Sequence, residues 1–111
     1  MTNSDGLAAD VDAVLRGSPK VHPFLHHEFH GLIGDSPNAN LREIKVSVLV
    51  RATDKFTSEY ALGPGLVNPG VESIHGLLIP YSGLPGLVAD DRVYQIELSR
   101  PVGIADAERV A

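Results

Sequence analysis

Residues 44–51, Ile-Lys-Val-Ser-Val-Leu-Val-Arg, decide the fold because two kinds of side chain alternate along them. One row is apolar and β-branched: Ile44, Val46, Val48 and Val50. The other row is mixed: Lys45, Ser47, Leu49 and Arg51. Successive side chains of a strand point to opposite faces, so this pattern predicts a strand with one buried face. The mixed row is then the outer face, either solvated or a docking surface, and Leu49 favours docking.

Beyond this strand the sequence predicts short helices and strands in alternation. The expected elements are a helix over residues 53–62, strands over 71–74 and 77–80, a helix over 84–89 and a strand over 93–98. His75-Gly76 is the expected bend between the middle strands, and Ser82 the expected N-cap of the second helix. The order from residue 42 is that of the ferredoxin-like split βαβ arrangement. The predicted class is α+β, an antiparallel sheet with two short helices on one face.

Residues 1–41 are expected to form a helical N-terminal extension, followed by the ferredoxin-like domain over 42–101 and a polar C-terminal tail over 102–111. The first helix begins near Ser4 or Asp5 and ends before Gly17 and Pro19, since capping residues and helix breakers stand at these places. A second helix begins at Pro23 and runs to about residue 32. The expected buried side of that helix is Phe24, Leu25, Phe29, Leu32 and Ile33.

Composition restricts the classes of partner. The chain has 111 residues, enough for one hydrophobic core, and a net charge of -5 without any basic run. Nucleic acid is therefore not an expected partner. There is no cysteine, which excludes disulfides and thiolate metal ligands. The first ten residues do not resemble a signal peptide, and no apolar run reaches the roughly 20 residues of a membrane span. We expect a cytoplasmic protein that makes no membrane contact.

Two segments between Lys45 and Pro101 form a characteristic pattern of packing residues. They are VSVLVRATDKF (46–56) and GLVNPGVESIHGLLIPYSGLPGLVADDRVYQIELSRP (65–101). The positions are Val71, Ser73, Ile74, Gly76, Ile79, Pro80, Leu84, Leu87, Val93, Ile96 and Glu97. This stretch resembles the propeptide-like inhibitor domain that precedes the catalytic domain of subtilisin-like serine proteases. The resemblance covers about half of the chain and leaves residues 1–41 aside.

The resemblance implies a protein-binding module. In that family the open face of the sheet packs on two helices of the protease, and the segment after the last strand enters the substrate cleft. Here the corresponding segment is Ser99, Arg100, Pro101 and Val102. An extended tail adds main-chain hydrogen bonds along a cleft while the sheet supplies buried area. Because no protease domain follows, we expect action in trans, as an inhibitor or a folding chaperone.

The histidines between residues 22 and 30 raise the question of a metal site. His22, His26 and His30 are spaced four apart, so one helical face would present several imidazoles. The motif His-Glu-x-x-His is absent, because one residue alone separates Glu28 from His30. We expect surface or capping histidines and neither a metal nor a cofactor, with these three as the candidates if a metal does bind. A pH-responsive face is a further interpretation.

The sequence also lacks the motifs of catalysis. There is no Gly-x-Ser-x-Gly nucleophile elbow and no Gly-Lys-Ser/Thr phosphate loop, so we do not expect an enzyme. The alternative to a protease-directed module is a non-catalytic oligomeric scaffold or interaction domain. In that alternative the open sheet face pairs with itself.

Overall fold

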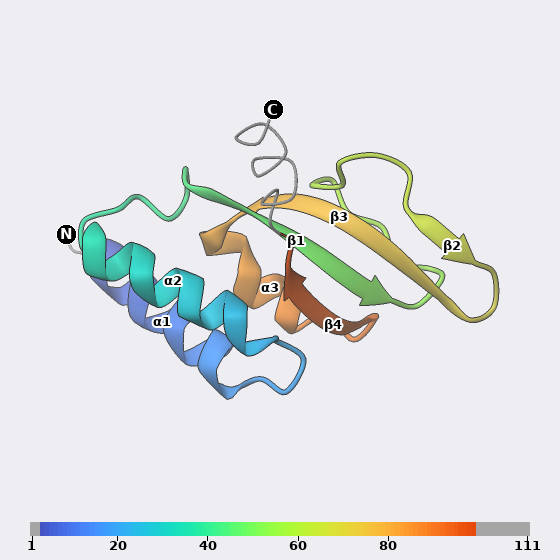
Figure 1. Ribbon diagram of the computed structural model, residues 1–111, viewed down its shortest axis with the longest axis horizontal. Coiled ribbons are helices and arrows are strands. Elements are labelled where there is room, and N and C mark those ends of the chain that lie inside the picture. Colours follow the sequence, from blue (N-terminus) through green and yellow to red (C-terminus); the bar gives the residue numbers. More distant parts are fainter. Residues whose placement is uncertain (1–2, 100–111) are drawn as a thin grey trace, which may run out of the picture.

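The computed structural model describes residues 3–99 and has an α+β fold (Figure 1). Two helices come first, and the strands follow with a 3-10 turn and a short helix between the last two. The elements are α1 (Asn3–Gly17), α2 (Pro23–Asp35), β1 (Lys45–Ala52), β2 (Leu66–Asn68), β3 (Glu72–Pro80), the 3-10 turn (Tyr81–Gly83), α3 (Leu84–Val88) and β4 (Val93–Leu98).

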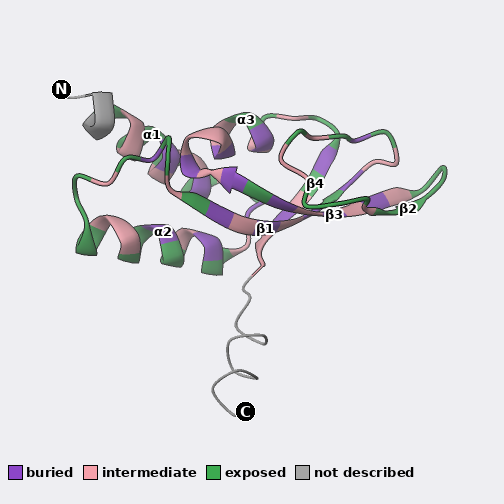
Figure 2. Cartoon of the chain, turned by 90° about the horizontal axis from the view of Figure 1, so that it is seen from above, coloured by how far each residue is buried: buried purple, intermediate pink, exposed green. Residues whose placement is uncertain are grey.

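The sheet confirms the predicted fold class. Its strand order is β2-β3-β1-β4, and each neighbouring pair is antiparallel. β3 therefore lies between β1 and β2, which is the split arrangement of a ferredoxin-like fold. Figures 1 and 2 place α1 and α3 on one side of the sheet and α2 beside its β4 edge. The opposite face of β1 and β3 carries no helix of the described chain.

The alternation in β1 sets the position of the core. Val46, Val48, Val50 and Ala52 are buried, whereas the residues between them are exposed or half-buried. Each valine that leaves water contributes roughly 1.5–3 kcal/mol of transfer free energy, so this row ties β1 firmly to one face. The expected strand with one buried face is confirmed, except that Ile44 lies just before it.

Two features replace the helix expected over residues 53–62. The chain runs there as turns and coil, and Ala61 forms an isolated antiparallel bridge with Leu77 of β3. Thr53 Oγ1 accepts from the Lys55 N–H at 3.3 Å, and Ser58 Oγ accepts from the Tyr60 N–H at 3.1 Å. Such local side-chain bonds compete with the hydrogen bonds of a helix. The helical expectation was therefore wrong.

The hairpin also lies elsewhere than expected. β3 runs unbroken through His75 and Gly76, so the bend expected there was wrong. The turn falls at Pro69-Gly70 instead, where Gly70 has a φ of 78° and Val71 N–H donates to the Asn68 carbonyl at 2.9 Å. Only glycine adopts such a φ without strain, which fixes the turn at this position.

The start of α3 differs from the sequence expectation as well. Ser82 lies inside the 3-10 turn, and the N-cap is Gly83, which makes no side-chain capping bond. Pro85 in the first turn pre-sets the helical φ and needs no N–H partner, so the helix begins without a capping hydroxyl.

The N-terminal helices belong to the same core as the sheet. Val11 and Leu15 of α1 and Leu25 and Phe29 of α2 are buried in one cluster with the strand residues. Phe24, expected on the buried side of α2, is instead 67% exposed. It lies at the start of the helix, next to the ring of His22, at 4.9 Å between centroids.

The segment between the two helices covers one edge of the sheet. Val21 forms a parallel bridge with Ile96 of β4. His22 N–H donates to the Ile96 carbonyl at 2.9 Å, and Ile96 N–H donates to the Lys20 carbonyl at 2.8 Å. The β4 edge is thus occupied by the chain itself, while β2 forms the other edge.

Candidate protein-docking face

The side of the sheet opposite the core is defined by the strand register, and we call it the open face. On β1 it consists of Lys45, Ser47, Leu49 and Arg51, the row expected from the sequence. The residues paired with them in register add Ile74, Gly76, Leu78, Gln95 and Glu97, and Leu66 of β2 follows from its pairing with Ile74. The structure therefore brings the β1 row together with three other strands.

The open face is apolar toward β2 and polar toward β4. One row across the sheet runs Gln95, Arg51, Ile74 and Leu66. Leu66 of β2 is 75% exposed, and Leu78, further along β3 and opposite Ser47, is 39% exposed, so these two strands offer apolar surface on this face. Single exposed apolar residues are ordinary on proteins, but several on one face indicate an interaction surface.

Gly76 makes a hollow at the centre of the open face. It lies opposite Leu49 in the register, and a Cβ built on it meets no atom within 4 Å. Gly65 is the contrast, because a Cβ there would come within 2.7 Å of the Ile74 carbonyl oxygen and would clash with the His75 ring. The space above Gly76 is therefore open to the side chain of a partner.

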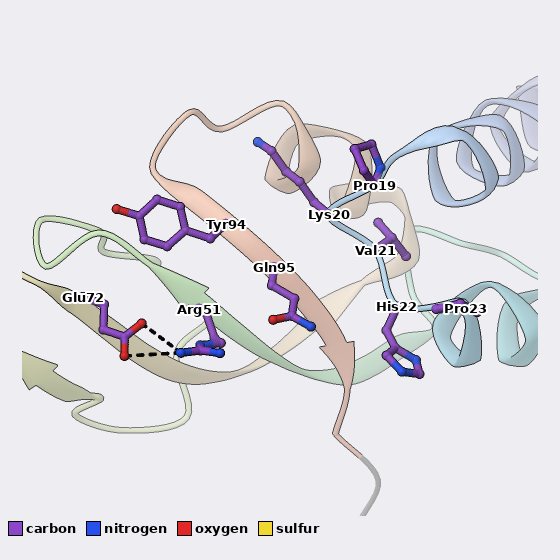
Figure 3. Close-up of a pocket in the computed structure, with 9 residues that line it drawn as sticks. All are labelled: Pro19, Lys20, Val21, His22, Pro23, Arg51, Glu72, Tyr94 and Gln95. Atoms are coloured by element: carbon purple, nitrogen blue, oxygen red, sulfur yellow. Dashed lines mark hydrogen bonds and ion pairs between the residues drawn. The ribbon is translucent and has the colours of Figure 1, made fainter.

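A polar pocket of about 460 Å³ adjoins the open face beside β4 (Figure 3). In it, Arg51 Nη2 donates to Glu72 Oε1 at 3.1 Å, and the two side chains are 46% and 29% exposed. An ion pair so exposed contributes about 1 kcal/mol or less to stability. The lining residues are Pro19, Lys20, Val21, His22, Pro23, Arg51, Glu72, Tyr94 and Gln95.

Tyr94 reaches the surface because of an irregularity in β4. Ala52 pairs with Val93 and Arg51 pairs with Gln95, so Tyr94 is an extra residue in this strand. The bulge lets both Val93 and Ile96 face the core and leaves Tyr94 52% exposed. Tyrosine offers a large apolar ring and a hydroxyl at low entropic cost, which suits a contact with another protein.

The segment that follows β4 starts from the open sheet. Ser99 N–H donates to the Ser47 carbonyl at 2.8 Å, which extends the pairing of β1 and β4 by one bond. The other residues expected to enter a partner's cleft, Arg100, Pro101 and Val102, lie outside the described residues.

The three candidate histidines do not converge on one point. His22 is the N-cap of α2, and its Nδ1 accepts from the Phe24 N–H at 3.2 Å. His26 Nε2 donates to Asp12 Oδ1 of α1 at 2.8 Å, and the ring of His30 lies 6.1 Å from that of His26. Within residues 3–99 no three His, Cys, Asp or Glu side chains are grouped as metal ligands would be.

The contact between His26 and Asp12 alters the titration of the carboxyl. The hydrogen bond from His26 is the main cause that lowers the pKa of Asp12, and the charge of Arg16, at 3.5 Å, acts in the same direction. Partial burial of Asp12 opposes both effects. The pair ties α1 to α2, so its evident role is structural.

Sequence reasoning identified the β1 row of the open face but did not join its neighbours into one surface. Gly76 was assigned to a bend and Leu66 to no element, while Leu78 was placed in a strand over 77–80 that was kept separate from the strand over 71–74. A signal was present: Ile74, Gly76 and Leu78 alternate with the buried Ser73, His75, Leu77 and Ile79. This two-residue alternation continues across Gly76, and following it would have predicted one continuous strand.

No helix in the described part of the chain has the length and apolar character needed to cross a membrane. Comparison with known proteins gives no further assignment, since no family model, no curated protein and no solved structure matches the chain.

Proposed function

We propose that the chain is a non-catalytic protein-binding module that acts in trans on a subtilisin-like serine protease, as an inhibitor or a folding chaperone. The single observation that carries this proposal is the open face: a ferredoxin-like sheet whose second face carries no helix from residues 3–99. The resemblance of residues 45–101 to the propeptide-like domain supplies the class of partner.

Two further observations support docking through this face. Its centre is hollow at Gly76 and lies beside Leu49, and β2 and β3 contribute the exposed Leu66 and Leu78. A surface of this kind can accept a row of apolar side chains from a partner and bury apolar area, the dominant favourable contribution to association. Arg51, Glu72 and Tyr94 line the polar pocket that adjoins this face, and a polar margin is usual for protein interfaces.

The tail is the second proposed contact. It leaves the sheet at Ser99, which is held to Ser47 by a backbone hydrogen bond of 2.8 Å. A segment anchored at one end loses less entropy when it binds an extended cleft than a free peptide does. We propose that Arg100, Pro101 and Val102 occupy the cleft while the open face docks beside it.

Deletion of residues 100–111 tests the tail. We expect the deleted chain to keep its fold, because Ser99 and its bond to Ser47 remain, and to inhibit a subtilisin-like protease at least about tenfold more weakly. Inhibition constants and circular dichroism measured side by side separate the two effects. An unchanged inhibition constant would remove the tail from the mechanism and leave docking through the face alone.

A further inference from the structure

The two edges of the sheet differ in a way that the protease proposal does not explain. The β4 edge is occupied by the chain itself, through the backbone bonds of Lys20 and His22 with Ile96. The β2 edge has no strand beside it among residues 3–99. An unpaired edge presents free backbone donors and acceptors and is a template for another strand.

The β2 edge is also the most apolar exposed part of the described surface. Of the large apolar side chains left exposed, four lie in the loop and hairpin around this strand: Leu62, Leu66, Val67 and Val71, with exposed fractions of 63%, 75%, 51% and 59%. Proteins protect an edge strand by keeping it very short, by placing proline at the edge, or by placing lysine or another charge on it. β2 is short and lies between Pro64 and Pro69, but it lacks the protection by charge. Here no residue from 60 to 71 is charged, although Glu59 and Glu72 flank the segment.

We propose that the β2 edge is a self-association surface, through which two copies of the chain pair antiparallel, strand β2 against strand β2. The absence of charge argues for a second copy as the occupant. The strand offers no charge for a different partner to complement, and two identical uncharged strands meet without repulsion. Each apolar contact is then made twice about a twofold axis. The net charge of -5 opposes association elsewhere on the molecule, so salt should strengthen the dimer by screening.

The register of β2 places Val67 on the axis of such a dimer. Val67 is the middle residue of the strand, so the two copies of Val67 lie directly opposite each other, and Leu66 of one copy faces Asn68 of the other. In antiparallel pairing, opposed residues share a face of the sheet. The two open faces would therefore lie on the same side of one continuous sheet, and both would stay free for a partner.

Sedimentation equilibrium over a range of chain concentrations tests the proposal. The wild-type chain should shift from the mass of one chain toward that of two, and more readily at high salt. Val67→Lys places two positive charges directly opposite each other at the twofold axis. Because they repel, we expect at least about tenfold weaker self-association. Leu66→Lys, on the other face of the same strand, serves as a second variant, and circular dichroism checks the fold of both.

Phe24→Lys is the matched control, because the exposed fraction of Phe24, 67%, lies between those of Val67 and Leu66, and Phe24 lies on α2. It should dimerise as the wild type does. A wild-type chain that stays monomeric at the highest concentration overturns the proposal, as does a dimer that Val67→Lys leaves unchanged. Neither result bears on protease inhibition, which is proposed to use the open face and not the pairing of the β2 edge. Because Leu66 belongs to the open face and Val67 does not, Val67→Lys is the variant that separates the two proposals.

Discussion

At the scale of single residues, two glycines near β3 have opposite surroundings. Gly65 approaches His75 so closely that a Cβ would clash with the imidazole ring and with the Ile74 carbonyl. Gly76 lies within β3 and has open space where a Cβ would be. His75 itself is buried against Phe56, at 5.3 Å between ring centroids, so its ring has little room to move.

Gly65→Ala should therefore destabilise the fold, by about 1–3 kcal/mol, which is the usual cost of overpacking. Gly76→Ala should stabilise it slightly, by about 0.5–1 kcal/mol, because glycine in a strand loses more backbone entropy than alanine. Urea denaturation of both variants measures the difference. Equal stability of the two variants would show that the close contact between Gly65 and His75 is not present in solution.

At the scale of elements, the sequence predicts well those segments whose residues alone determine their structure. β1 follows from its four alternating apolar residues, and α1 from the periodic spacing of its apolar residues. The expected caps Ser4 and Asp5 lie inside α1, which begins at Asn3. The segment from residue 53 to 70 does not, because turn bonds of Thr53 and Ser58 and the positive φ of Gly70 outweigh its helical residues. Half of the open face was predictable from β1; the other half depends on a pairing register between strands far apart in sequence.

The contact between α1 and α2 has a predictable pH dependence. The pKa of Asp12 is lowered in the folded chain, mainly by the hydrogen bond from His26. A carboxyl whose pKa is lower when folded stabilises the fold above its unfolded pKa, and this stabilisation is lost as the pH falls through the folded pKa.

We expect Asp12→Asn to be less stable than the wild type near neutral pH, by less than about 1 kcal/mol because the pair is partly exposed. The two stabilities should converge at acid pH. Denaturant titrations across this pH range check the expectation, with Asp10→Asn, an exposed carboxyl of the same helix, as control. Parallel pH profiles for wild type and Asp12→Asn would contradict it.

At the scale of the whole molecule, the helices cover one face of the sheet and the chain covers one of its edges. α1 and α3 lie over the core side, and the segment between α1 and α2 pairs with β4. No helix or strand from residues 3–99 covers the open face or the β2 edge. The central claim is that the open face docks on a subtilisin-like protease, and the hollow at Gly76 allows this claim to be tested without disturbing the core.

The most direct measurement is the inhibition of a panel of subtilisin-like proteases by the wild-type chain and by Gly76→Leu. A Cβ at this position meets no atom within 4 Å, and the leucine side chain would extend from it into the space on the docking face. Gly31→Leu adds the same side chain to an exposed position of α2 and is the control. We predict slow, tight inhibition by the wild type and by Gly31→Leu, and inhibition at least about tenfold weaker by Gly76→Leu. A wild-type chain that is digested without slowing any of these proteases, or inhibition that Gly76→Leu leaves intact, would contradict docking through the open face.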